Sequence, residues 1–352
     1  MKHRKTGELE FESYEESSMY FAKLLAINSN DSVKSLNMRN VNTYKEEIVE
    51  LRNVNYVIPG GRVLSENPFH RQQPFWAISE TLSEILNLSR PIMERYSPET
   101  MDWAYNVGSD RQPEYAYGER WHVHNQLLNI FRKLGEKPTT KKAHLQIYDG
   151  SDTGFSRVEI PCTIGHTLSI RDDRLDITAY FRSQDFFAGN LYDTFLANFL
   201  QNSFVSWLKN SGHENLQCGD LHFVVNSLHY YPSKSSEKLE KMIAHGETDF
   251  YSNTKPYEID RDITGYFEDL YHLSDSEQAA YHHNFKYAEV KREKIVSPVF
   301  KDFSTFYLIK NAKYANEECL ETKYREELLV PEIRKWVNKI IELKKQENIE
   351  NA

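Results

Sequence analysis

Apolar side chains recur at helical spacing in several segments of the first 210 residues. Between 75 and 88, Ile78, Leu82 and Ile85 fall on one face of a helix, which predicts that this helix is buried. Gly135 ends another such segment, because glycine commonly follows the last helical turn. Helices are therefore expected over 14–27, 75–88, 125–134 and 192–209.

Strands are indicated where apolar and polar residues alternate, or where short apolar runs lie between turn residues. Pro59-Gly60-Gly61 forms a turn after the first strand, and Asp172-Asp173-Arg174 joins two others. The segment 28–42, rich in Asn and Ser, is expected to be a loop. Strands are expected over 46–58, 143–148, 167–170, 175–181 and 221–230.

The pattern changes after about Ser233, where further helices are expected over 236–245, 275–287 and 332–345. Pro331 suits the first position of the last helix, which needs no backbone N–H. Its apolar stripe is expected to pack on the domain or on a dimer partner, and residues 346–352 are expected to fray. The pattern predicts an α+β chain with an N-terminal extension (1–45), a core (46–235) and a mostly helical C-terminal extension (236–352).

Composition and charge narrow the possible functions. Hydrophobic residues make up 39% of the 352 residues, enough for one large domain or two ordinary ones. The net charge of −9 argues against direct nucleic-acid binding, although a local basic pocket for a small anionic substrate remains compatible with it.

The three cysteines, Cys162, Cys218 and Cys319, are far apart and form no Cys-x-x-Cys pair. This argues against a disulfide framework and a zinc site, and favours a reducing cytoplasm. The start of the chain lacks the apolar core of a signal peptide, and no stretch approaches the roughly 18 apolar residues of a membrane span. We expect a soluble, cytoplasmic protein with no membrane partner and no metal.

Candidate chemistry is concentrated between Pro161 and Tyr231. Cys162 is followed by Arg182-Ser183-x-Asp185, by Asp193 and by His229-x-Tyr231. Together these groups can activate a thiol, bind a phosphate, contact the edge of a base and bind a sugar hydroxyl. The set predicts covalent chemistry on a pyrimidine nucleoside monophosphate.

These residues resemble the thymidylate synthase family, and are most similar to its deoxycytidylate (dCMP) 5-hydroxymethyltransferase branch, known from bacteriophages. The resemblance is clearest from Tyr115 to Tyr231 and extends from Arg52, about half the chain. It implies a thymidylate synthase-like mixed sheet with flanking helices, a homodimer that packs sheet against sheet, and 5,10-methylenetetrahydrofolate as co-substrate. In order, the motifs are Tyr117-Gly118-x-x-Trp121, Lys141-Lys142, Cys162-Thr163, Ile170-Arg171-Asp172, Arg182-Ser183-x-Asp185, Gly189, Asp193 and Leu228-His229-x-Tyr231.

The resemblance implies that Cys162 is a nucleophile that adds to C6 of the base, so that C5 becomes able to attack a one-carbon donor. Arg182 would favour the thiolate and, with Ser183, bind the 5′-phosphate. For a lone cysteine between strands, the structural alternative is a small buried hydrophobic residue.

Further basic residues are implied at the phosphate. Lys141 and Lys142 stand where the family has a basic pair donated by the other subunit, usually Arg-Arg. Lysine cannot make the bidentate contact. The alternative for the two lysines is a solvated turn. Arg52 matches an N-terminal phosphate-binding arginine, with Arg62 as a rival.

Asp193 would select the base. Thymidylate synthases have asparagine here, which matches uracil. A protonated aspartic acid can instead donate to N3 of cytosine and accept from its N4 amino group, and burial favours the protonated form. The alternative is a capping aspartate of the helix that begins near Tyr192.

The resemblance also assigns the remaining residues. Glu80, with Glu84 as the alternative one turn away, would be the general acid/base, and Tyr117 joins the catalytic set. The remaining assignments place His229 and Tyr231 at the ribose 3′-hydroxyl, and Asp185, Gly189 and Trp103 at the folate. A core His-Tyr pair is the structural alternative for the first two.

Two features distinguish this chain from the synthases. Thr163 follows Cys162, as in hydroxymethylases, where synthases have histidine. The chain also continues for over a hundred residues past Tyr231 without the short hydrophobic tail that closes over folate. Both favour hydroxymethylation of dCMP. Thymidylate synthesis from dUMP, hydroxymethylation of CMP, and a silent homologue that acts as a binding module remain the alternatives.

Overall fold

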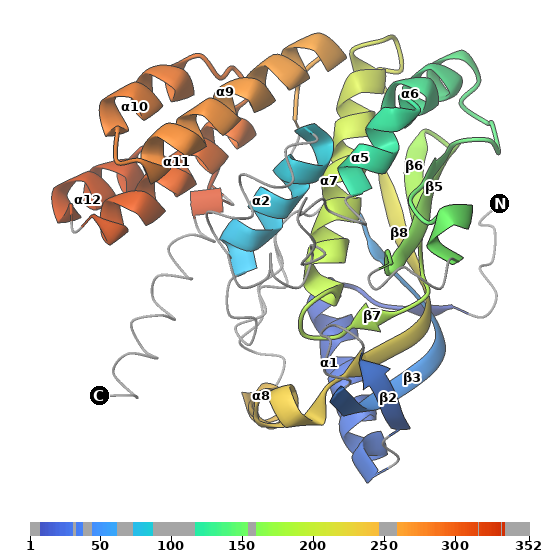
Figure 1. The fold of residues 1–352 in the computed structure, drawn as a ribbon. Coiled ribbons are helices and arrows are strands. Elements are labelled where there is room, and N and C mark those ends of the chain that lie inside the picture. The colour runs from blue at the N-terminus through green and yellow to red at the C-terminus, as the bar shows by residue number, and fades with distance from the viewer. Residues whose placement is uncertain are drawn as a thin grey trace.

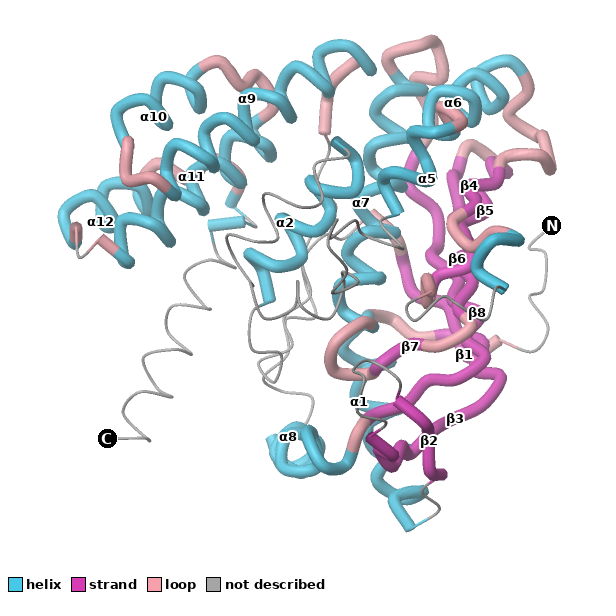
Figure 2. Tube along the Cα trace, viewed as in Figure 1, coloured by secondary structure: helices cyan, strands magenta, loops and turns pink. Residues whose placement is uncertain are grey.

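A mixed β-sheet forms the centre of the molecule. The computed structural model describes residues 8–30, 33–37, 44–61, 73–86, 117–153, 160–245, 259–315, 317–331 and 333–334. The main path of the sheet runs β1-β3-β8-β6-β5-β4, with β2 paired to β3 and β7 to β8 (Figure 2). The strands are β1 (Leu9–Glu10), β2 (Val33–Asn37), β3 (Tyr44–Pro59), β4 (His144–Gln146), β5 (Thr163–Arg171), β6 (Arg174–Phe181), β7 (Gln184–Asp185) and β8 (Gln217–Tyr230).

The pairing explains why the sheet is mixed. β8 runs antiparallel to β3 on one side and parallel to β6 on the other. β5 and β6 form a hairpin whose turn residues Asp172 and Asp173 both have positive φ, which aspartate tolerates better than most residues. The predicted mixed sheet with flanking helices is confirmed.

Helices cover one face of this sheet, and α7 (Asn190–Lys209) lies between the sheet and an outer helical layer (Figure 1). Alternate residues of β6, among them Leu175, Ile177 and Phe181, are buried on the sheet face that packs against helices. The other helices of this half are α1 (Tyr14–Ile27), α2 (Gln73–Leu86), α5 (Tyr117–Val123), α6 (Gln126–Glu136) and α8 (Pro232–His245).

The outer layer packs on α7 through aromatic side chains. The Trp207 and Tyr266 ring centroids lie 5.0 Å apart, and the Tyr266 hydroxyl is 2.6 Å from Oγ of Ser203. Buried carboxylates link its helices: Asp269 accepts from the amides of Val296 and Ser297. The layer comprises α9 (Ile263–Tyr281), α10 (Phe285–Glu293), α11 (Pro298–Tyr314) and α12 (Glu318–Glu326).

Two predictions of secondary structure were wrong. The segment expected to be a loop at 28–42 contains a 3₁₀ turn (Asn28–Asn30) and β2, which pairs with β3 in register Val33↔Ile48. The helix expected over 275–287 is interrupted: α9 ends at Tyr281, and Asn284 caps α10 by accepting from the amide of Tyr287. Composition does not separate a polar strand from a loop, or a helix cap from a helix interior.

The remaining predicted elements that fall on described residues match the observed ones to within about four residues at each end. Sequence reasoning did not predict β1, β7, α5, α11 or α12. The expected helix 332–345 lies outside the described residues except at 333 and 334. β1 and α1, from the N-terminal segment, pack against β3. The boundaries at 45 and 235 stay a prediction. Within the described part of the chain, no helix is long and apolar enough to cross a membrane.

Gly118 sets the contact between α5 and α2. A Cβ at this position would lie 2.1 Å from the backbone oxygen of Glu84, so only glycine allows this approach. Gly118→Ala should therefore destabilise the fold by about 1–3 kcal/mol, the usual cost of overpacking. Gly150→Ala is the matched control, because a Cβ at that position would have nothing within 4 Å. Thermal unfolding of the two variants compares them; equal melting temperatures would contradict the prediction.

Candidate active site

The thiol of Cys162 lies beside a fixed guanidinium. Cys162 precedes β5, and Arg182 follows β6, the strand paired with β5. Nη2 of Arg182 lies 3.8 Å from Sγ of Cys162. The guanidinium is held there because Nε donates to the carbonyl of Pro161 and Nη2 to that of Ile160, each over 2.8 Å. A guanidinium at this distance can favour a thiolate, so the geometry is compatible with the role that the resemblance implies for Arg182, which stays a prediction.

The phenol of Tyr117 contacts Thr163 and is influenced by Cys162 and by two carboxylates. Its hydroxyl accepts from Oγ1 of Thr163 over 2.9 Å, next to Cys162. Burial, followed by the charges of Asp193, Cys162 and Glu80, raises the pKa of Tyr117 well above its ordinary value. These electrostatic effects require proximity, so the structure brings the other three predicted catalytic residues near the phenol of Tyr117.

The two candidate acid/base residues on α2 have different surroundings. Burial and, as the smaller cause, the charge of Glu80 raise the pKa of Tyr192. The same charge contributes to the raised pKa of Tyr117. Glu84 instead accepts from the backbone amide of Gly118, and burial raises its pKa to about 8. Glu84 therefore holds α2 against α5, and Glu80 is the glutamate beside the proposed catalytic groups.

Asp193 lies in the first turn of α7 but does not cap it. The helix begins at Asn190 and its N-cap is Gly189, which rules out the capping alternative. One carboxylate oxygen, Oδ2, accepts from Nε2 of Gln184 over 2.9 Å. Although part of the residue remains exposed, desolvation of the carboxylate raises the pKa of Asp193 to about 7.

A tight turn joins β7 to α7 and sets Asp185 close to Asp193. Oδ1 of Asp185 accepts from the amides of Phe187 (2.8 Å) and Ala188 (3.0 Å), and its carbonyl accepts from Gly189. Among the described residues, Oδ2 of Asp185 has no hydrogen-bond partner and is available to a ligand. A Cβ on Gly189 would lie 3.3 Å from Oδ2 of Asp193, so glycine keeps this space open.

The end of β8 reaches the same edge of the sheet. His229 pairs with Asp185 in the β7–β8 ladder, and its carbonyl accepts from Phe186 over 2.7 Å. The His229 and Tyr231 rings meet edge to face with centroids 5.3 Å apart. Strand pairing thus places the predicted sugar-binding pair beside the predicted folate-binding aspartate.

The remaining predicted residues are less closely connected. Ser183 is half-buried next to Arg182, whereas Arg52 is exposed on β3 opposite Ser227. Lys141 and Lys142 are exposed in the turn between α6 and β4. Trp103 and Arg62 lie outside the described residues. The roles of this group stay predictions.

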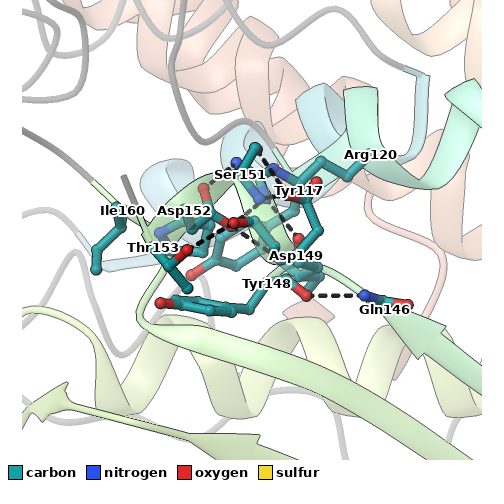
Figure 3. A network of polar contacts seen from close by, with 12 residues as sticks. Tyr117, Arg120, Gln146, Tyr148, Asp149, Ser151, Asp152, Thr153 and Ile160 are labelled. Carbon is teal, nitrogen blue, oxygen red and sulfur yellow. Dashed lines mark hydrogen bonds and ion pairs between the residues drawn. The ribbon is translucent and has the colours of Figure 1, made fainter. Parts of the chain in front are cut away.

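A buried ion pair joins α5 to the residues that follow β4. Arg120 contacts both oxygens of Asp152, at 2.5 and 2.8 Å, and donates to the carbonyl of Ile147 over 2.7 Å (Figure 3). Burial opposes the charge of Asp152, but the guanidinium still lowers its pKa. Sequence reasoning missed this pair, because an Arg and an Asp 32 positions apart form no local pattern.

Sequence reasoning also missed the polar chain behind Asp193. Gln184, Asn190 and Tyr56 are buried and hydrogen-bonded to one another in series. Gln184 occupies the variable position of the Arg-Ser-x-Asp motif, and Asn190 follows Gly189 directly. The sequence did carry a signal for them: both are polar residues inside or next to the motifs that precede an apolar helix.

One cluster outside these groups has the donor atoms of a metal site. Asp176, Asp220 and His222 offer ligand atoms within 4.8 Å of one another on β6 and β8. Nδ1 of His222 also lies 3.2 Å from Glu8, and Arg174 lies 3.5 Å from Asp220. With three carboxylates, one arginine and one histidine, this group keeps an excess of negative charge.

Comparisons with known proteins agree with this geometry. The thymidylate synthase family model matches residues 26–284, so the chain belongs to the thymidylate synthase family. A putative thymidylate synthase of Methanosarcina mazei is 36% identical over 87 residues, which are 22% of this chain and 39% of that protein. One of Methanococcoides burtonii is 32% identical over 133 residues, 32% of this chain and 60% of that protein.

The fold has a solved counterpart. Thermostable thymidylate synthase A from Bacillus subtilis superposes with a TM-score of 0.51 at 13% identity, covering 64% of this chain and 83% of that one. The predicted thymidylate synthase-like fold is thereby confirmed.

Proposed function

We propose that this protein transfers a one-carbon unit from 5,10-methylenetetrahydrofolate to C5 of dCMP and releases 5-hydroxymethyl-dCMP. One observation carries the choice of base: the residue at position 193 is a carboxyl group whose pKa is raised to about 7. Such a group is substantially protonated near neutral pH. It can therefore donate to N3 of cytosine while accepting from the N4 amino group.

The proposed covalent step uses Cys162 and Arg182. The thiolate forms a bond to C6 of the pyrimidine, and the displaced electron pair gives C5 the character of a nucleophile. C5 then bonds to the one-carbon unit that the folate supplies. Loss of the C5 proton and departure of tetrahydrofolate would then leave an exocyclic methylene at C5. Water supplies a hydroxide to this methylene, and release of the thiolate from C6 restores the aromatic ring of 5-hydroxymethyl-dCMP. Arg182 favours the thiolate at 3.8 Å and, with Ser183, binds the 5′-phosphate.

Proton transfers in this scheme belong to Glu80 and Tyr117. The phenol contacts Thr163 and is influenced by the charges of Cys162, Glu80 and Asp193, so it lies within reach of a base bound there. Oδ2 of Asp185, which has no hydrogen-bond partner among the described residues, is assigned to the folate ring together with Gly189 and Trp103. His229 and Tyr231 are assigned to the sugar.

Thymidylate synthesis from dUMP is the second candidate, because the relatives are named putative thymidylate synthases. Product analysis with dCMP, CMP and dUMP, each with methylenetetrahydrofolate, tests the choice. We expect 5-hydroxymethyl-dCMP from dCMP and little product from the others. Preferred formation of dTMP from dUMP would replace the proposal with a synthase. Turnover of CMP alone would identify a ribonucleotide enzyme, and no turnover would favour the binding module.

The proposed role of Asp193 predicts a pH dependence. The reactive form is protonated, so kcat/KM for dCMP should be high below pH 7 and fall above it, by about tenfold per pH unit. Because the reaction also needs a Cys162 thiolate, kcat/KM should fall separately on the acid side of its pH profile. Asp193→Asn should retain slow dCMP turnover without the alkaline limb. A limb that persists in this variant would contradict the assignment.

We also propose a homodimer in which Lys141 and Lys142 complete the partner's phosphate site. The sheet face opposite α7 carries half-buried side chains such as Thr178, Tyr180 and Val224, which suits packing against a second sheet. Mixing Cys162→Ser subunits with Lys141→Ala/Lys142→Ala subunits should restore about a quarter of the activity, because half of the dimers then contain one intact site. A monomer in sedimentation, or no recovery on mixing, would refute this.

A further inference from the structure

A carboxylic acid at position 193 can pair with either pyrimidine. With the proton on the oxygen that faces N3, it donates to N3 of cytosine and accepts from the N4 amino group through its other oxygen. With the proton on that other oxygen, it accepts from N3–H of uracil and donates to O4. Selectivity therefore requires a neighbour that decides which oxygen of Asp193 carries the proton.

Gln184 is the neighbour that can determine which oxygen of Asp193 carries the proton. Its Nε2 donates to Oδ2 of Asp193 over 2.9 Å. An unprotonated carboxyl oxygen is a better acceptor than one that carries a proton, so this hydrogen bond directs the proton to Oδ1. Gln184 is only 1% exposed, so solvent does not compete for the amide.

A buried series of hydrogen bonds orients the side-chain amide of Gln184. Oε1 of Gln184 accepts from Nδ2 of Asn190 over 3.0 Å, and the same nitrogen donates to the hydroxyl oxygen of Tyr56, also over 3.0 Å. Oγ1 of Thr194 donates to the carbonyl of Asn190 over 2.6 Å. The Thr194 hydroxyl also acts on the neighbouring phenol, where it partly offsets the rise that burial causes in the pKa of Tyr56.

If one amide in this hydrogen-bonded series were turned over, donors would face donors and acceptors would face acceptors. If the Gln184 amide alone turned over, its NH₂ would face the NH₂ of Asn190, and its oxygen would face the carboxylate of Asp193. Buried polar groups left without a partner cost roughly 1–3 kcal/mol each. A flip of Gln184 alone is therefore disfavoured, and the donors point from Asn190 through Gln184 to Asp193.

We propose that Gln184, oriented by Asn190 and Tyr56, is the positioning residue that gives the enzyme its base selectivity, by holding the proton of Asp193 on Oδ1. This inference rests on the proposed dCMP activity, with Oδ1 facing N3 and Oδ2 facing the amino group at C4. Gln184 itself need not touch the substrate.

The test compares tritium release from 5-labelled dCMP and dUMP, expressed as the ratio of kcat/KM values. Gln184→Met keeps the length of the side chain but removes the donor, so the ratio should move toward one by roughly tenfold or more. The alkaline limb of the dCMP profile should also move to higher pH, because the Gln184 hydrogen bond lowers the pKa of Asp193. A purely structural role would not move this limb.

Gln201→Met is the matched control. Gln201 is a fully buried glutamine on α7 that donates to the carbonyl of Leu175 over 2.7 Å and accepts from the amide of Gly61 over 2.9 Å. The same chemical change is made there, away from Asp193. It should lower stability but leave the ratio and the pH limb as in the wild type.

Asn190→Leu tests the same point if Gln184→Met fails to fold. It leaves Gln184 in place but releases its orientation, so the ratio should again fall. A wild-type ratio and an unmoved limb in both variants would overturn the inference. A wild-type preference for dUMP that collapses in Gln184→Met would instead refute the dCMP proposal while supporting the role of Gln184.

Discussion

Cys162→Ser should abolish turnover, with a loss on the order of 10⁴-fold or more, as is typical when a covalent nucleophile is removed. A hydroxyl is not ionised near neutral pH, and the Arg182 guanidinium at 3.8 Å cannot change this enough to compensate. Nucleotide binding should remain nearly unchanged, because the thiolate is needed only for addition to C6. Isothermal titration with dCMP and a turnover assay on the same preparation measure both quantities.

Cys218→Ser is the control for this experiment. Cys218 is also half-buried, but it lies on β8 with its thiol 3.6 Å from Oδ1 of Asn202, and it belongs to none of the groups around Tyr117. It should retain wild-type turnover. Near-normal activity in Cys162→Ser would refute the covalent mechanism, and loss of activity in both variants would point to general damage.

Exchanging the acid and the amide between positions 184 and 193 should invert the base preference. In the double variant Gln184→Glu/Asp193→Asn, the new carboxylate at 184 accepts from the new amide at 193. The NH₂ is then fixed on the side of the 4-substituent, and the carbonyl faces N3, which matches uracil. Two misplaced hydrogen bonds with cytosine, at roughly 1–3 kcal/mol each, correspond to a change of about 30-fold to 10⁴-fold.

Asp193→Asn alone should behave differently from the double variant. Gln184 still donates to the oxygen of the new amide, so the NH₂ faces N3 and the pattern still matches cytosine. We expect slower turnover with dCMP still preferred, measured by tritium release from the two labelled nucleotides. If the single variant alone prefers dUMP, the orientation of position 193 does not depend on Gln184.

The elements that sequence predicted best are those whose pattern reflects burial. α7, with nearly continuous burial, and the hairpin of β5 and β6 were predicted within a few residues. β2 was missed because its polar residues give no alternating signal, and it forms only because β3 extends far enough to pair with it. The interruption at 282–284 was missed because a cap depends on one backbone angle, here φ of 57° at His283.

The candidate site divides in a similar way. Cys162, Arg182 and Asp193 could be identified from ordered motifs. In the structure Arg182 contacts Cys162, and both Cys162 and Asp193 influence Tyr117. The groups that orient Asp193 could not be identified, because Tyr56 is far from Asn190 and Gln184 in the sequence and joins them only in the folded protein. The resemblance already favoured Glu80 over Glu84, and the structure adds that Glu84 accepts from the Gly118 amide of α5.

The order of strands in the sheet has a consequence for how the chain acquires its shape. β3 ends at Pro59, but its long antiparallel partner β8 begins only at Gln217, and the hairpin of β5 and β6 joins the sheet through β8. During synthesis from the N-terminus, β3 therefore cannot pair with β8 until most of the chain has left the ribosome. Contacts between such distant segments slow folding, and unpaired strand edges favour aggregation. β8 also carries His229. The nascent chain therefore has neither a complete sheet nor a complete candidate site until β8 is made.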